Sequence, residues 1–330
     1  MSGPMESKPY REDRLVNRAV FRMVGVLVVA AMVAVGCGGG GGGASGDVDL
    51  SDADLVVGSK DFTEQLILGY ITLQALENAG ANVEDQVGLA GTDAARQALV
   101  GGDIDMYWEY TGTIWINHLG NTKPIPDSKK QYEAAAKADM EQENLKLLEP
   151  APFNNTYALA IREEAAEDVG VEKLSDLKTL VEENPDEATV CVESEFNSRD
   201  DGLPGLEKEY GFQFPKGNVA LFDTGTVYQR TDKGDPCNFG EVFTTDGRIE
   251  ALGLTAIEDD KNFFPKYNPA LEVRKETFDQ YGPQLEEIFT PIAKALDAKT
   301  MTEMNARVDV DGELPEDVAE DFLSEKGFVE

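Results

Sequence analysis

Residues 54–80, DLVVGSKDFTEQLILGYITLQALENAG, set the fold class of this chain. The apolar run at 55–57 predicts a buried strand, and the apolar residues after it recur every three or four positions, as in an amphipathic helix that Gly80 ends. Asp61 and Glu64 have the spacing of a helix capping box. A strand followed directly by a helix is therefore expected here.

The same alternation continues outward from this segment. Residues 83–89 predict a second strand, 91–100 a helix and 104–108 a third strand. This order implies a parallel sheet with right-handed crossovers. Ligands of such sheets lie beyond the carboxyl ends of the strands.

The middle and the end of the chain follow a similar pattern. Strands are expected at 157–161, 188–192 and 270–273, and helices at 175–183, 205–210, 277–289, 291–298, 302–307 and 315–326. Two α/β lobes that hold a ligand where they meet are the simplest architecture that fits this order.

The composition argues against several classes of protein. The chain has 330 residues, with 63 acidic against 29 basic residues and a formal net charge of −34. This length suits about two domains, and this charge repels nucleic acids, which we exclude as partners. Because His118 is the one histidine, we expect no His-rich metal site and no metal or other cofactor. No Gly-x-Ser-x-Gly nucleophile elbow occurs, and we do not expect an enzyme.

The N-terminus has the order of residues found in export signals. Five Lys and Arg residues precede an uncharged apolar run at 23–36, which is shorter than the roughly 20 residues that a spanning helix needs. Cys37 follows directly, and glycines fill 38–43. The pattern looks like a bacterial lipoprotein signal, so we expect a signal peptide at 1–36, lipidation of Cys37 and a Gly-rich tether at 37–53. The alternative is an ordinary cleaved signal followed by a chance cysteine.

Cys191 and Cys237 are the two remaining cysteines. Disulfides persist in the compartment that an exported chain reaches. A bond between the two would close a loop of about 46 residues and stabilise the fold by roughly 4 kcal/mol. We expect this structural disulfide. The alternatives are two buried free thiols or a metal-binding pair, although no CxxC motif or nearby histidine favours a metal.

Several short motifs occur in one order along residues 54–330 and together resemble a known family. The motifs are Gly58–Gln65, Gly91-Thr92, Glu109–Thr113, Tyr157–Ala160, Glu195–Arg199, Asp201-Gly202 and Thr244–Asp246. The chain resembles the substrate-binding proteins of osmoprotectant ABC importers, which take up glycine betaine, choline or carnitine.

This resemblance implies a two-lobed, type II periplasmic-binding fold of the Venus-flytrap kind, with a mainly parallel sheet flanked by helices in each lobe. The first lobe would consist of residues 54–154 and 266–330, and the second of residues 155–265. The chain would cross between the lobes near 153–157 and 263–267.

The resemblance also implies an aromatic cage for a trimethylammonium group. Such a cation has no N–H donor, so proteins surround it with the faces of aromatic rings. The positions that match the family's four cage tyrosines are Tyr110, Tyr157, Phe243 and Tyr267, and Phe243 departs from the pattern by lacking the hydroxyl. Asn155 matches a residue that offers its backbone to the cation.

The carboxylate of a betaine needs cationic donors. The resemblance assigns this role to Lys60 and Arg199, with a further hydroxyl from Thr113, and an arginine can hold a carboxylate through two hydrogen bonds. The alternatives are that Arg199 pairs with Asp200 or Asp201, and that Lys60 is a solvated turn residue.

The function implied is capture of quaternary ammonium osmoprotectants and delivery to an ABC permease. We expect a monomer that is extracytoplasmic and lipid-anchored to the outer face of the cell membrane. The alternative is a binding protein for an amino acid or another carboxylated solute, since fold alone does not decide between these. Several aromatic side chains in the cleft would favour the quaternary ammonium ligand.

Overall fold

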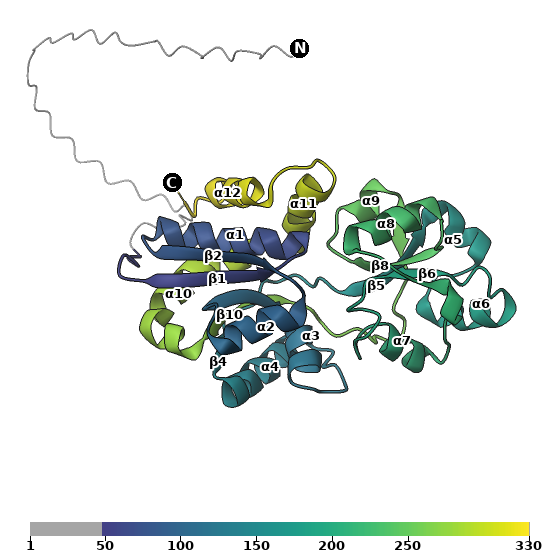
Figure 1. Ribbon diagram of the computed structural model, residues 1–330, viewed down its shortest axis with the longest axis horizontal. Coiled ribbons are helices and arrows are strands. Elements are labelled where there is room, and N and C mark those ends of the chain that lie inside the picture. The colour runs from purple at the N-terminus through teal and green to yellow at the C-terminus, as the bar shows by residue number, and fades with distance from the viewer. Residues whose placement is uncertain (1–47, 330) are drawn as a thin grey trace, which may run out of the picture. The chain divides into compact units, whose positions relative to one another are not determined.

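The computed structural model describes residues 48–329 (Figure 1). The expected signal peptide at 1–36 and the lipidation site Cys37 lie outside these residues. Of the expected tether at 37–53, residues 48–53 are described, and here the structure differs from the prediction. Leu50 and Ala53 are buried in the core, and the Leu50 backbone N–H donates to the carbonyl of Ala79. The packed fold therefore includes Leu50, because burial of this apolar side chain in the core is favourable.

Within residues 48–329, ten strands form two five-stranded sheets. The first sheet has the order β2 (Asn82–Leu89), β1 (Asp54–Lys60), β3 (Met106–Tyr110), β10 (Pro269–Arg274) and β4 (Leu145–Leu147). The second has the order β7 (Val219–Leu221), β6 (Val190–Val192), β8 (Phe239–Phe243), β5 (Tyr157–Arg162) and β9 (Leu254–Ala256). We call the first sheet with its helices lobe 1 and the second sheet with its helices lobe 2.

Both sheets are mixed. In lobe 1, β1, β2 and β3 are parallel, as predicted, but β10 is antiparallel to β3 and β4. In lobe 2, β6, β7 and β8 are parallel and β5 is antiparallel to β8 and β9. β5 and β10 are the first strands after the chain changes sheets, so no helical crossover imposes a parallel direction on them. The expectation of two α/β lobes is thus confirmed, with more antiparallel pairing than expected.

Lobe 1 is built from both halves of the chain. Its helices are α1 (Thr63–Asn78), α2 (Thr92–Gly101), α3 (Thr111–Thr113), α4 (Ser128–Glu143), α10 (Lys275–Ala295), α11 (Ala298–Asp309) and α12 (Pro315–Glu325), together with a π-helical turn at Ile114–His118. The C-terminal helix α12 packs on α1, as Figure 1 shows. The shared core includes Trp108, Leu271 and Phe289.

The structure corrects the prediction of separate helices at 277–289 and 291–298. A single helix, α10, runs through Pro283 and Pro291. A proline inside a helix removes a backbone hydrogen bond and costs about 3 kcal/mol. Leu285, Phe289 and Ile292 lie on the buried face of α10, and burial of such side chains contributes roughly 1.5–3 kcal/mol each. Packing therefore offsets the effect of the prolines.

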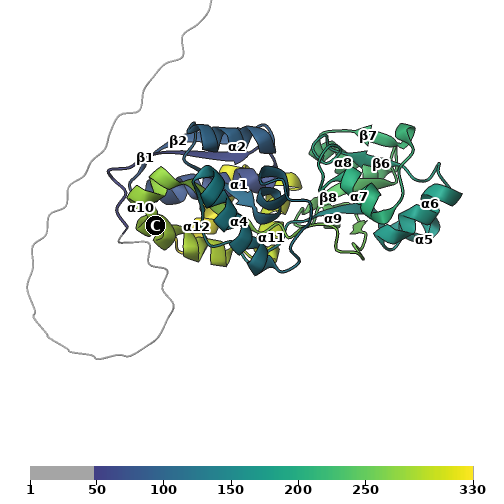
Figure 2. The same cartoon turned by 90° about the horizontal axis from the view of Figure 1, so that it is seen from below.

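Lobe 2 holds the predicted disulfide. Its helices are α5 (Glu163–Val169), α6 (Leu177–Glu183), α7 (Leu203–Tyr210), α8 (Thr224–Lys233) and α9 (Arg248–Ala251), grouped around the second sheet (Figure 2). Cys191 on β6 is bonded to Cys237, just before β8, with a Cα–Cα distance of 5.6 Å. Both residues are buried. The bond ties together two neighbouring strands of this sheet.

No helix within the described residues is long and apolar enough to cross a membrane.

Candidate functional site

A cavity of about 590 Å³ lies at the carboxyl ends of strands from both lobes. This position agrees with the rule for ligands of α/β sheets. All eight residues predicted to bind the ligand line the cavity: Lys60, Tyr110, Thr113, Asn155, Tyr157, Arg199, Phe243 and Tyr267. The structure therefore brings the whole predicted set together, and the role of each residue in binding stays a prediction.

Aromatic rings form a continuous cluster along this cavity. The Tyr157 ring lies 5.1 Å from Phe243 and 5.6 Å from Tyr267, between ring centroids. Phe62 stacks at 5.2 Å on Phe243 and at 6.2 Å on Tyr110. Phe62 was not among the predicted residues. The cavity is thus lined by five rings, which we call the aromatic cluster.

Glu64 is a buried carboxylate beside the aromatic cluster. Its oxygens accept hydrogen bonds from the hydroxyl of Tyr110 at 2.8 Å, from Oγ1 of Thr245 at 2.5 Å and from Nδ2 of Asn305 at 3.2 Å. The predicted capping box is wrong, because α1 begins after Phe62 without a side-chain cap and Glu64 faces the cavity. Burial raises the pKa of Glu64, and these hydrogen bonds oppose the rise. A cation in the cavity would favour its ionised form.

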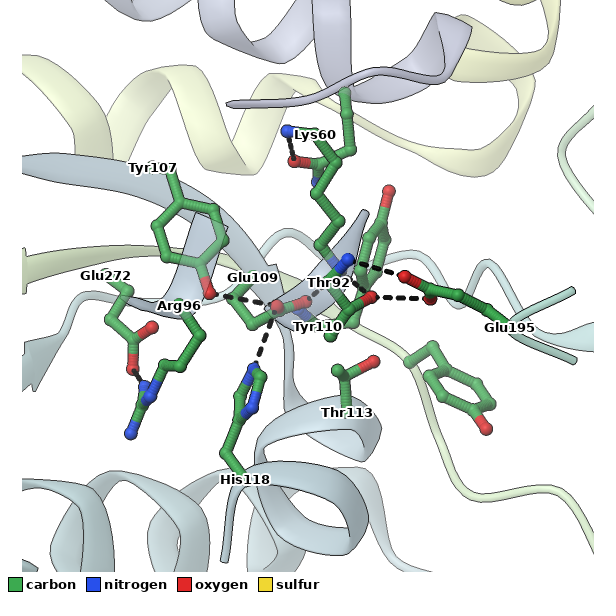
Figure 3. Close-up of polar contacts among 12 residues, drawn as sticks. Lys60, Thr92, Arg96, Tyr107, Glu109, Tyr110, Thr113, His118, Glu195 and Glu272 are labelled. Carbon is green, nitrogen blue, oxygen red and sulfur yellow. Dashed lines mark hydrogen bonds and ion pairs between the residues drawn. The ribbon is translucent and has the colours of Figure 1, made fainter. Parts of the chain in front are cut away.

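Lys60 is paired with a buried carboxylate. Its Nζ donates to Glu109 Oε1 at 2.7 Å, and both side chains are almost fully buried. Figure 3 shows that Glu109 also meets Tyr107, whose hydroxyl donates at 3.0 Å, and His118, whose Nε2 lies 3.2 Å away. Burial raises the pKa of Glu109, but Lys60 and His118 more than offset this and hold it well below its usual range. The alternative of a solvated Lys60 is therefore wrong.

Arg199 is paired with Asp201, one of the two partners considered from the sequence. Nε and Nη2 of the guanidinium donate to the two oxygens of Asp201 at 2.8 and 2.7 Å. The remaining nitrogen, Nη1, lies 3.4 Å from Oγ1 of Thr92 and from Oε2 of Glu195. The guanidinium is also 5.5 Å from the centre of the Tyr157 ring. Both predicted carboxylate-binding cations therefore already have internal carboxylate partners.

The cavity has a strongly acidic lining. Among the described residues, eight carboxyl groups and three basic side chains line it. The third basic residue, Arg248, is held by Asp246 at 2.5 Å and Asp309 at 3.4 Å. Burial raises the pKa of Glu241 to about 8, so this group is mostly protonated at neutral pH. The remaining charges attract cations and repel anions.

The sequence contained signals for the residues that the prediction missed. Phe62, Glu64, Thr92 and Glu195 lie inside the motifs quoted above, but none of them is among the predicted ligand-binding residues. Glu241 is two residues before Phe243 on β8, and alternate residues of a strand point to the same face. Because Phe243 was predicted to line the cavity, Glu241 could have been predicted to line it too.

Comparison with known proteins identifies the family. The family described as the substrate binding domain of ABC-type glycine betaine transport systems matches residues 53–325. The chain belongs to this family. Its members are binding proteins of importers, which agrees with the predicted class of protein.

Three relatives illustrate the similarity. A glycine-betaine-binding protein of Pseudomonas aeruginosa is 39% identical over 278 residues, which are 82% of this chain and 87% of that protein. An ergothioneine transport permease/ergothioneine binding protein of Helicobacter pylori, EgtU, is 36% identical over 84% of this chain and 49% of its own length. The crystal structure of a glycine betaine/carnitine/choline ABC transporter protein is 27% identical, with a TM-score of 0.67, and covers 83% of this chain and 99% of that one. The predicted two-lobed periplasmic-binding fold is thereby confirmed.

Proposed function

We propose that this protein captures quaternary ammonium solutes in the cavity between its lobes and delivers them to an ABC permease. The aromatic cluster carries the proposal. Phe62, Tyr110 and Tyr267 come from lobe 1, and Tyr157 and Phe243 come from lobe 2. A trimethylammonium group is held by ring faces because it has no hydrogen to donate.

The charges of the cavity support the same ligand class. Glu64 lies next to the aromatic cluster and is buried, so a cation bound there would gain a negative neighbour. Its oxygens already accept three hydrogen bonds. A carboxylate has about four acceptor sites, so Glu64 has about one left for the three N–H donors of an amino acid's ammonium group, and the rings beside it offer no further acceptor. A quaternary ammonium ligand, which has no N–H donor to satisfy, therefore suits this site better than an amino acid.

Ligand capture would involve closure of the two lobes. We take residues 54–154 and 266–330 as lobe 1 and 155–265 as lobe 2, with crossings near 153–157 and 263–267. Direct contacts span the cavity: Glu64 accepts from Thr245, and Arg248 lies 3.4 Å from Asp309. A ligand that contacts rings of both lobes favours the closed arrangement by its differential affinity for it.

The protein would act outside the cytoplasm, attached to the membrane through Cys37 as a monomeric lipoprotein. The support is the order of charged, apolar and small residues that ends at this cysteine. One acyl chain gives only marginal binding, so stable attachment requires more than one.

A calorimetric ligand panel tests the proposal. The purified protein is titrated with glycine betaine, choline, carnitine, ergothioneine and several amino acids. We expect at least one quaternary ammonium compound to bind. We expect Tyr157→Leu to weaken that binding about 30-fold, since a cation–π contact in a dry site contributes about 2 kcal/mol. Tyr70→Leu, on α1 outside the cavity, is the matched control. Binding of amino acids without a response to any quaternary ammonium compound would refute the proposal.

A further inference from the structure

The N-terminus of α2 is capped by the carboxylate of Glu195, a residue of the other lobe. The backbone N–H of Thr92 donates to Glu195 Oε1 at 2.6 Å, and the Thr92 hydroxyl donates to Glu195 Oε2 at 2.8 Å (Figure 3). The helix has no side-chain cap of its own, because Gly91 stands at its N-cap position. Glu195 therefore satisfies donors that the helix leaves open, and its charge suits the positive end of the helix dipole.

Gly91 is required for this contact. Its φ of 82° lies in the left-handed region that favours glycine. A Cβ atom at this position would also come within 2.7 Å of Glu195 Oε1. The loop before α2 is thus shaped to receive the Glu195 carboxylate closely.

Arg199 completes the surroundings of this carboxylate. Its Nη1 lies 3.4 Å from Glu195 Oε2, while its other nitrogens are used by Asp201. Thr92, Arg199 and Glu195 all line the cavity that holds the aromatic cluster. A helix N-terminus, a hydroxyl and a guanidinium are the donors that a solute carboxylate would need. In this structure Glu195 uses them.

We propose that Glu195 is a specificity-determining residue that occupies the carboxylate position of the site. This inference rests on the proposed function and narrows its substrate class. A quaternary ammonium solute with a neutral hydrogen-bonding end, such as choline, binds with Glu195 in place. A solute with a carboxylate, such as glycine betaine, binds only after displacing it, because two carboxylates cannot share one set of donors without repulsion.

The cavity offers a partner to a neutral polar end. Tyr157 is 7% exposed and lines the cavity, and within residues 48–329 no group hydrogen-bonds its hydroxyl. This hydroxyl can donate to or accept from an alcohol. Glu193 also lines the cavity, and its carboxylate adds to the repulsion of an anionic end.

The test compares two ligands that share one cation. Glycine betaine and choline are titrated into the wild-type protein, Glu195→Gln and Glu195→Ala. Asp200→Asn is the matched control, since Asp200 is an exposed acid of the same loop and does not line the cavity. Thermal unfolding of each variant reports its stability. The structure predicts that the wild type prefers choline and that both Glu195 variants bind glycine betaine about 10- to 100-fold more tightly, the range expected for charge-assisted hydrogen bonds. Choline affinity should change less than about threefold, and Asp200→Asn should leave the ratio of the two affinities unchanged.

Three results would overturn this inference. If Glu195 only joins the lobes, the affinities for both ligands fall by the same factor in the Glu195 variants. If a ligand carboxylate binds elsewhere, the ratio of the two affinities stays at its wild-type value. In both cases the proposed function stands, because both ligands still bind the wild type. Binding of neither ligand to any of the proteins would overturn this inference, and it would refute the proposed function as well if carnitine and ergothioneine also fail to bind.

Discussion

Replacement of Glu241 by Gln should stabilise the protein, and by more as the pH rises. Burial raises the pKa of Glu241 to about 8, against its usual 4.5. Between these two values the unfolded chain releases a proton that the folded chain keeps, so the wild type loses stability as the pH rises through this window. Each pKa unit corresponds to about 1.4 kcal/mol, which makes the whole loss about 5 kcal/mol. Gln is neutral at every pH and can still accept the hydrogen bond that the backbone N–H of Glu193 donates.

The assay is denaturant unfolding of the wild type and Glu241→Gln at pH 4.5, 6 and 8. The free energies of unfolding of the two proteins should nearly agree at pH 4.5. At pH 8, the value for Glu241→Gln should exceed that of the wild type by up to about 5 kcal/mol. Asp200→Asn removes an exposed carboxyl from lobe 2 and should show no such trend. A constant difference between Glu241→Gln and the wild type across this range would mean that Glu241 ionises alike in the folded and unfolded chains, and that burial does not raise its pKa.

Three further predictions concern other parts of the molecule. Cys37→Ala should release the protein into the medium or leave an unprocessed precursor, and unchanged lipid labelling of the variant would count against attachment at this residue. Replacement of both Cys191 and Cys237 by Ser should lower the free energy of unfolding by about 2–5 kcal/mol, measured against the oxidised wild type; equal stabilities would show that the bond contributes nothing. Arg199→Ala should lower the free energy of unfolding by about 3–5 kcal/mol in the same assay, because it leaves the buried Asp201 carboxylate without its cation. A loss below about 1 kcal/mol would show that the Arg199–Asp201 pair is not needed for stability.

The elements with strong local patterns could be predicted from the sequence. β1 and α1 lie within a few residues of the expected bounds, because an apolar run and a helical repeat leave few alternatives. α4 was not predicted, since its sequence SKKQYEAAAKADMEQE has only two large apolar residues, Tyr132 and Met140, and buries only a narrow face. The antiparallel positions of β5 and β10 depend on contacts between distant parts of the chain, which local patterns do not contain.

The residues of the candidate site could be predicted, but their pairings could not. The motifs placed Lys60 and Arg199 at the cavity. Their bonds to Glu109 and Asp201 depend on side-chain geometry. In a chain with 63 acidic residues, the sequence does not single out the carboxylate that pairs with a given cation. For the same reason, the contact of Glu195 with Thr92 in the other lobe could not be predicted.

A crystal structure of the protein grown with choline would show whether the aromatic cluster holds the cation of a quaternary ammonium solute. We expect the trimethylammonium group within about 6 Å of the centres of four rings of the cluster, Tyr110, Tyr157, Phe243 and Tyr267, which is the range of a cation–π contact. Choline bound away from these rings, or with its hydroxyl end among them and its ammonium group in solvent, would show that the cluster does not bind the cation.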